Sequence, residues 1–125
     1  MKPWSTWTLS AKLAWQHPLV RWLWLCVALM FVGTVPFFVY RLLPHAYRSG
    51  TVVLHYNVYF GIDRIQTWGW MFFLPFLWLC LLVFDACLSF GFFCRDRSLS
   101  IGLTFVAFLW SIGWMAGLIS LFFMN

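Results

Sequence analysis

Hydrophobic residues fill three long runs of this chain, and polar residues gather in the segments between them. Residues 19–42, 70–94 and 99–124 are almost continuously apolar, and about 20 apolar residues are enough to cross the hydrocarbon core of a bilayer. Each run predicts a transmembrane helix, because a helix satisfies its backbone hydrogen bonds internally in lipid. We expect the three helices to occupy residues 19–42, 69–94 and 99–124.

The N-terminal segment, residues 4–17, alternates apolar and polar residues instead of forming a continuous apolar run. Aromatic and small apolar residues recur there at spacings of three and four: Trp4, Trp7, Ala11, Ala14 and Trp15. This pattern predicts an amphipathic helix that lies in the membrane interface with its tryptophans toward lipid. Pro18 is expected to end it, because the residue before a proline is pushed out of the α region.

Residues 43–68 form the longest polar segment and are expected to be a loop outside the membrane. Pro44 and Gly50 indicate turns near its start. Residues 51–60, TVVLHYNVYF, are rich in β-branched and aromatic residues and predict one short strand. Alternate side chains of a strand share a face, so three polar side chains are expected on one side of it: His55, Asn57 and Tyr59.

The end of this segment predicts the start of the second helix. Gly61 is expected to break the strand. Asp63 is followed three residues later by Gln66, a variant of the capping box in which an acidic side chain accepts backbone hydrogen bonds at a helix start. We therefore expect Asp63 to cap the second helix; a role in ligand binding is the alternative.

The same segment resembles a known pattern, carried by His55, Asn57, Gly61 and Asp63. It is similar to the H-x-N, G, D segment of the DUF1648 membrane proteins, and closer to an HYN…G-D stretch in small, uncharacterised three-helix bacterial membrane proteins. The glycine stands one residue later than in DUF1648, and Gln66 replaces a second glycine. Neither group has an activity that carries over to this chain, but some DUF1648 relatives are immunity or signalling proteins, and the resemblance points in that direction.

Composition supports a membrane protein with one domain, residues 1–125. Hydrophobic residues make up 64% of the 125 residues and charged residues 9%, whereas soluble domains average roughly 45–50% and 25%. A soluble domain of this size buries only part of its surface. The fold class expected is therefore all-α integral membrane: an interfacial helix, three transmembrane helices and one strand-like outer loop.

The net charge of +5 comes from scattered basic residues, so we expect membrane lipids as partners and no nucleic acid. Basic residues also predict orientation, because they favour the cytoplasmic side. Lys2, Lys12, Arg21, Arg95 and Arg97 fall on one side, against Arg41, Arg48 and Arg64 on the other. We expect a bacterial inner-membrane protein with its N-terminus in the cytoplasm and its C-terminus outside.

Asp85 is the one carboxylate inside a predicted span. Such a group costs about 2.5–3.5 kcal/mol on insertion scales. We expect it to be protonated and hydrogen-bonded to a polar side chain of the third span: Thr104, Trp110 or Ser111. A proton-carrying role and a contact with a partner subunit remain as alternatives.

Small residues predict two helix-packing seams. Cys80 and Cys87 are seven residues apart, with Gly91 near the same helix face, and Gly113 and Gly117 form a G-x-x-x-G pair on the third span. Small residues let helix backbones approach closely in membranes. We expect one seam to pack within the bundle and the other to be available to another chain.

Little of the sequence points to chemistry. No histidine lies in a predicted span, as a haem ligand would, and no nucleophile–base pair or metal-ligand spacing stands out. We expect no enzyme activity, cofactor or metal. The expected function is an accessory or assembly subunit of a membrane complex. Ligand or toxin binding by the outer loop is one alternative, and self-association into a pore lined by Asp85 is another.

Overall fold

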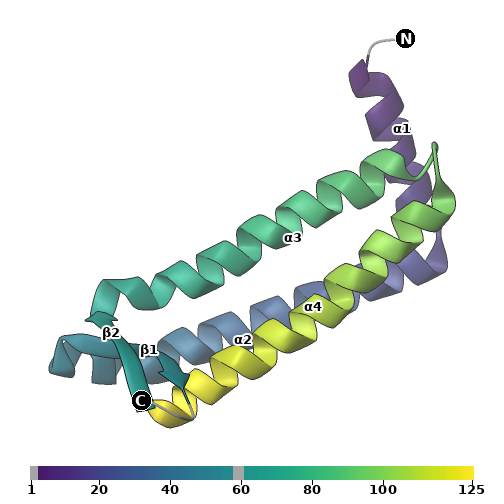
Figure 1. Cartoon of the computed structure of the whole chain (residues 1–125). Coiled ribbons are helices and arrows are strands. Elements are labelled where there is room, and N and C mark those ends of the chain that lie inside the picture. The colour runs from purple at the N-terminus through teal and green to yellow at the C-terminus, as the bar shows by residue number, and fades with distance from the viewer. Residues whose placement is uncertain (1–2, 58–60) are drawn as a thin grey trace.

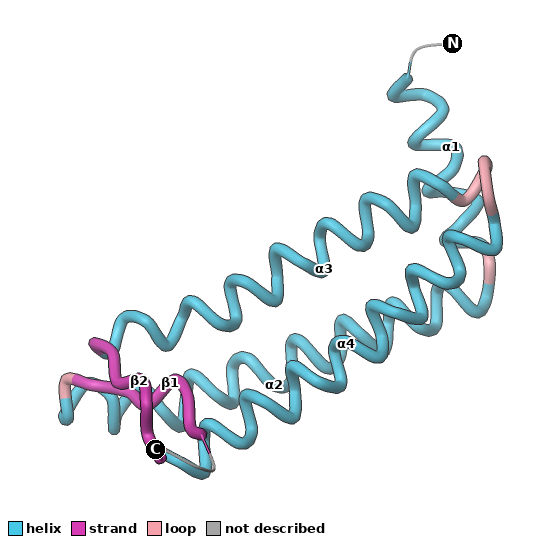
Figure 2. Tube along the Cα trace, in the orientation of Figure 1, coloured by secondary structure: helices cyan, strands magenta, loops and turns pink. Residues whose placement is uncertain are grey.

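The computed structural model describes residues 3–57 and 61–125, and helices make up most of that length (Figure 2). The elements in chain order are α1 (Pro3–Gln16), α2 (Pro18–Ser49), β1 (Thr51–Asn57), β2 (Gly61–Thr67), the 3₁₀ helix η1 (Trp68–Phe72), α3 (Phe73–Phe92) and α4 (Arg97–Met124).

Three segments are long and apolar enough to cross a membrane: Pro18–Ser49, Trp68–Phe92 and Arg97–Phe123. This confirms the three predicted helices. α1 and the turn between α3 and α4 lie at one end of the bundle, here called the turn end (Figure 1). The two strands and the C-terminus lie at the other end, the hairpin end.

α4 is the central helix, because both α2 and α3 pack along it. The residues that α4 buries are mostly small: Ser100, Thr104, Ala107 and Ser111, followed by Leu118. The first four recur at spacings of three and four, and Leu118 follows two turns later, so they form one stripe along the helix. Small side chains let neighbouring backbones come close, and this stripe gives α4 its two neighbours.

Large rings fill the space between α2 and α3. The ring centroids of Phe31 and Trp78 are 5.1 Å apart, and those of Trp24 and Phe90 are 5.7 Å apart. Trp78 is fully buried and also stacks on Trp114 of α4 at 6.4 Å. α2 and α3 therefore meet through aromatic side chains, whereas each meets α4 at closer range.

Three buried hydroxyl groups join α3 to α4 near the turn end. The hydroxyl oxygens of Ser89 and Thr104 are 2.7 Å apart. Ser100 Oγ donates to the carbonyl of Ser89 at 2.7 Å, and Thr104 Oγ1 donates to the carbonyl of Ser100 at 2.9 Å. All three residues are fully buried, so each polar group meets the requirement for a partner inside the bundle.

Ser10 of α1 completes the end of α3. Its hydroxyl donates to the carbonyl of Phe90 at 2.7 Å and accepts from the amide of Cys94 at 3.0 Å. Those two backbone groups are four residues apart, so Ser10 occupies the place of the next helical hydrogen bond. The last carbonyls of a helix lack partners within it, and here α1 supplies one.

The helix predicted over 4–17 is confirmed as Pro3–Gln16. His17 is extended (φ −74°, ψ 119°) ahead of Pro18, as the rule for residues before proline requires. The prediction had placed Ala14 on the lipid-facing side with the tryptophans, and this is wrong: Ala14 and Ser10 are buried while Trp4 is exposed.

The predicted loop 43–68 begins too early. α2 continues through Pro44 to Ser49, and it ends at Gly50, whose φ of 73° is left-handed. The amide of Gly50 donates to the carbonyl of Ala46 at 2.9 Å. A proline removes one helical hydrogen bond, and long apolar helices tolerate that loss. The glycine gives the actual stop, because it adopts the left-handed conformation without strain.

The polar segment contains two strands instead of the predicted one. β1 pairs antiparallel with β2, in a register that joins Thr51 to Thr67 and Asn57 to Gly61. Gly61 was predicted to break the strand but begins β2. A lone strand would leave its backbone groups unpaired, and the second strand supplies their partners.

The predicted cap at Asp63 is also wrong. Asp63 lies inside β2, and the helical region begins later, at η1, after Thr67. Thr67 makes no side-chain capping bond; instead the amide of Trp68 donates to the carbonyl of Gly50 at 3.2 Å. The capping-box pattern failed because strand pairing takes up the backbone of residues 61–67.

The hydroxyl contact between α3 and α4 predicts a strong effect of Ser100→Leu. A leucine would overfill a fully buried site, and overpacking costs roughly 1–3 kcal/mol. We expect a lower free energy of unfolding, measured by denaturant titration in micelles with circular dichroism. Ser98→Leu, at an exposed position of the same helix, is the control; equal midpoints for the two variants would contradict the packing described.

The Ser10 bridge predicts that Ser10→Ala releases α1. The change leaves two backbone groups of residues 90 and 94 without a partner, at a cost of about 1–3 kcal/mol. We expect hydrogen exchange of the α1 amides to accelerate by roughly tenfold or more. Ser120→Ala, which removes only a local bond to the carbonyl of Ala116, should leave α1 unchanged. Unaltered exchange in Ser10→Ala would refute the bridge.

Candidate functional site

The outer-loop motif lies on the hairpin. His55 pairs with Arg64 and Asn57 pairs with Gly61 across the two strands, so the backbone brings both ends of the motif to one short ladder. Tyr59 lies outside the described residues, as do the side chains of His55, Asn57 and Asp63. The predicted polar face of the motif therefore stays a prediction.

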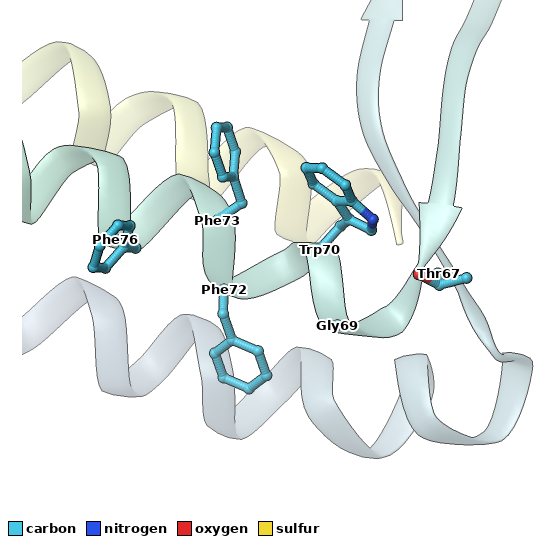
Figure 3. Close-up of a pocket in the computed structure, with 6 residues that line it drawn as sticks. All are labelled: Thr67, Gly69, Trp70, Phe72, Phe73 and Phe76. Carbon is cyan, nitrogen blue, oxygen red and sulfur yellow. The ribbon is translucent and has the colours of Figure 1, made fainter.

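An open groove lies beside the hairpin, at the start of α3. Its volume is about 450 Å³. Six residues line it: Thr67, Gly69, Trp70, Phe72, Phe73 and Phe76. Figure 3 shows the rings of Phe72 and Phe73 on opposite sides of the helix. The lining is mainly aromatic and open to one side, and Thr67 adds one hydroxyl group to it.

Asp85 lies on the buried face of α3. The residues that α3 buries include Trp78, Leu82 and Ser89, and Asp85 continues their spacing of three and four. It is itself only half-buried. Among the described residues it makes no hydrogen bond or ion pair. A carboxyl group on an apolar helix normally has a partner. Because Asp85 has none among the described residues, its oxygen atoms are available to another molecule at the edge of the bundle.

The hydrogen bond predicted between Asp85 and Thr104, Trp110 or Ser111 of the third span is absent, because none of these three side chains is available to it. Thr104 bonds to Ser89 and Ser100. Ser111 is buried, but its hydroxyl donates to the carbonyl of Ala107 in its own helix at 2.8 Å. Trp110 is 53% exposed and faces outward. Every predicted partner is satisfied elsewhere or turned away.

The first predicted seam does not hold the bundle together. Cys80 and Cys87 are exposed free thiols. Gly91 alone makes a close contact: a Cβ at that position would lie 3.1 Å from Nε1 and 3.2 Å from Cδ1 of Trp7. Gly91 therefore makes room for α1, and the two cysteines face away from the other helices of this chain.

The second predicted seam is open along its length. A Cβ built on Gly113 or Gly117 would meet no atom within 4 Å, and Ala116 and Ser120 beside them are exposed too. Together these four residues form a patch of small side chains on the outward face of α4, here called the α4 small patch. We expected one of the two seams to pack within the bundle. That expectation is wrong for Cys80 and Cys87 of the first seam, and it is also wrong for Gly113 and Gly117 of the second.

Sequence reasoning missed the contacts that hold the bundle together. Ser10, Ser89 and Ser100 were not singled out, although each is buried and hydrogen-bonded. One signal was available for α4: Ser100 and Thr104 begin the small-residue stripe at a spacing of four. For Ser10 no sequence signal exists, because its partners lie 80 or more residues away.

In the part of the chain that the structure describes, no three histidine, cysteine, aspartate or glutamate residues gather as metal ligands would. No protein-family model, curated protein or solved structure matches the chain. The resemblance of the hairpin segment to the DUF1648 proteins stays a prediction.

The two aspartates on either side of the turn predict opposite outcomes. Asp85→Leu removes no hydrogen bond or ion pair to the described residues, so the free energy of unfolding of the purified protein should stay equal or rise. Asp96→Leu removes the cap of α4, in which Oδ1 accepts from the amide of Leu99 at 3.0 Å, and should cost about 1 kcal/mol. Denaturant titration of both variants checks this; a loss for Asp85→Leu would reveal an internal partner.

Proposed function

We propose that this chain is a small integral membrane protein that acts by association, as an accessory or assembly subunit of a larger membrane complex. The observation that carries the proposal is the α4 small patch, which is exposed and has open space over both of its glycines. The role in this proposal is non-enzymatic, because the chain would act through a docking surface.

A lipid-facing helix gains nothing from small residues, because acyl chains pack as well against larger apolar side chains. A second helix does gain, since glycine and alanine let two backbones approach to short range. Close approach also permits weak Cα–H···O contacts between the helices. Gly113 and Gly117 at this spacing on an uncovered face therefore favour a partner helix as the occupant.

Asp85 adds a polar anchor to the proposal. A half-buried carboxyl group without a partner in the described part of the chain favours a hydrogen-bond donor from another chain, because an unpaired polar group in lipid is costly. A second copy of this protein is one form of the same proposal.

The membrane in this proposal is the bacterial inner membrane, with the turn end in the cytoplasm. Four described basic residues lie at the turn end: Lys12, Arg21, Arg95 and Arg97. Two lie toward the hairpin end, Arg41 and Arg48. The side with more basic residues near the helix ends usually stays in the cytoplasm. The C-terminus, at the hairpin end, is then outside.

The test is a tagged chain purified from native membranes in mild detergent, with the companions quantified by mass spectrometry. We expect the double variant Gly113→Leu and Gly117→Leu to lose the main companion by about tenfold or more, which corresponds to about 1.4 kcal/mol, because two leucines hold a partner helix away. A second, differently tagged copy in the same cells measures self-association.

Gly102→Leu is the matched control for this experiment. It lies on α4 toward the turn end, is exposed, and also has open space around it. It should retain the companion. An equal loss with Gly102→Leu, or no loss with the double variant, would show that the α4 small patch is not the docking surface.

A further inference from the structure

The turn end gathers basic side chains from three separate parts of the chain. Lys12 comes from α1, Arg21 from the first turn of α2, and Arg95 and Arg97 from the connection between α3 and α4. In the sequence they are more than 80 positions apart at the extremes. The fold brings them to one end of the bundle (Figure 1).

Two contacts hold this group together. The first is the Ser10 bridge, in which Ser10 Oγ accepts from the amide of Cys94 at 3.0 Å. Lys12 follows two residues after Ser10, and Arg95 is the next residue after Cys94. A short polar contact thus fixes the α1 backbone that carries the lysine beside the backbone that carries the arginine.

The second contact is the ring of Phe93. The guanidinium of Arg97 lies over this ring, 5.7 Å from its centroid, and the imidazole of His17 lies 5.9 Å from the same centroid. The amide of Arg21 donates to the carbonyl of His17 at 3.0 Å, which places Arg21 one helical turn along α2. Phe93 therefore connects the start of α2 to the start of α4.

The positive charge at the turn end is not neutralised within the chain. In residues 3–57 and 61–125, none of the four basic side chains makes an ion pair. Asp96 is the acidic residue among them, and its Oδ1 accepts from the amide of Leu99. The turn end therefore carries four positive charges against one negative charge, and this excess attracts anions from outside the chain.

We propose that the turn end binds the phosphate headgroups of anionic phospholipids. Guanidinium groups recognise phosphate through paired N–H donors, and an ammonium group adds a point charge. The position of the group favours lipid over a soluble anion, because it lies where apolar helices end and headgroups begin. This site is separate from the α4 small patch and takes a different partner.

Tryptophans at the same end support a lipid as the occupant. Four are exposed there: Trp4, Trp7, Trp15 and Trp22. Indole rings concentrate at the boundary between acyl chains and headgroups, where the ring meets apolar chains and the N–H meets polar groups. The guanidinium of Arg21 lies 5.9 Å from the ring centroid of Trp22, so a lipid bound there would meet an apolar and a charged group together.

The hairpin end provides a matched control within the same molecule. Arg41 and Arg48 are described and exposed there, and the guanidinium of Arg41 lies 5.8 Å from the ring centroid of its helix neighbour Phe37. They come from one helix, and no hydrogen bond or ring contact joins them to each other. Removing two charges at each end therefore compares a gathered group with a dispersed one.

The experiment reconstitutes the full chain in nanodiscs that contain equal amounts of phosphatidylglycerol and phosphatidylcholine. After detergent extraction and washing, mass spectrometry quantifies the lipids retained per chain. We expect phosphatidylglycerol to be enriched severalfold over phosphatidylcholine. The variant Arg95→Gln with Arg97→Gln should lose most of this enrichment, whereas Arg41→Gln with Arg48→Gln should keep it.

Further arms separate charge from folding and lipid from other anions. Arg95→Lys with Arg97→Lys preserves charge and should retain much of the enrichment, while circular dichroism confirms helix content in every variant. Equal loss from both glutamine pairs, or no enrichment in the unaltered chain, would overturn the proposal. So would binding of glycerol 3-phosphate, an oligonucleotide or an acidic peptide as tightly as phosphatidylglycerol, because the lipid would then not be the preferred ligand.

Discussion

Close approach of α4 to two neighbours is the condition on which the bundle depends. Its buried stripe begins with Ser100, Thr104 and Ala107, and these small residues let α3 come near enough for Ser89 to exchange hydrogen bonds with α4. In an apolar solvent hydrophobic burial contributes little between helices, so packing and polar contacts decide which helices associate. The aromatic rings between α2 and α3 then fill the space that this arrangement leaves.

The sequence predicted the three apolar helices well, because length and hydropathy alone identify a segment that can cross a membrane. It failed where two local signals competed. Pro44 and Gly50 both indicate a helix end, and only the glycine gave one. Asp63 carried a capping pattern, but the pairing of β2 with β1 took precedence. Strand pairing depends on β1, which lies outside the few residues around Asp63 that form the capping pattern.

The candidate site illustrates a second limit, which is rotation about the helix axis. The spacing of Cys80 and Cys87 showed that they share a face, and the same holds for Gly113 and Gly117, yet neither spacing says which way that face points. In helices that are apolar all round, hydrophobicity does not separate inside from outside. The small polar residues that do mark the buried face of a helix, such as Ser89, received no weight in the prediction, which relied on Asp85 as the polar group of α3.

The bridge made by Ser10 has a consequence for the order of events during synthesis. The groups that Ser10 contacts lie 80 and 84 positions later in the chain, so α1 leaves the ribosome long before its docking site exists. It must wait, undocked, until α3 and the following turn have been made. A contact of such long sequence separation forms late in folding, so α1 is translated before α3 and yet is among the last elements to reach its final place.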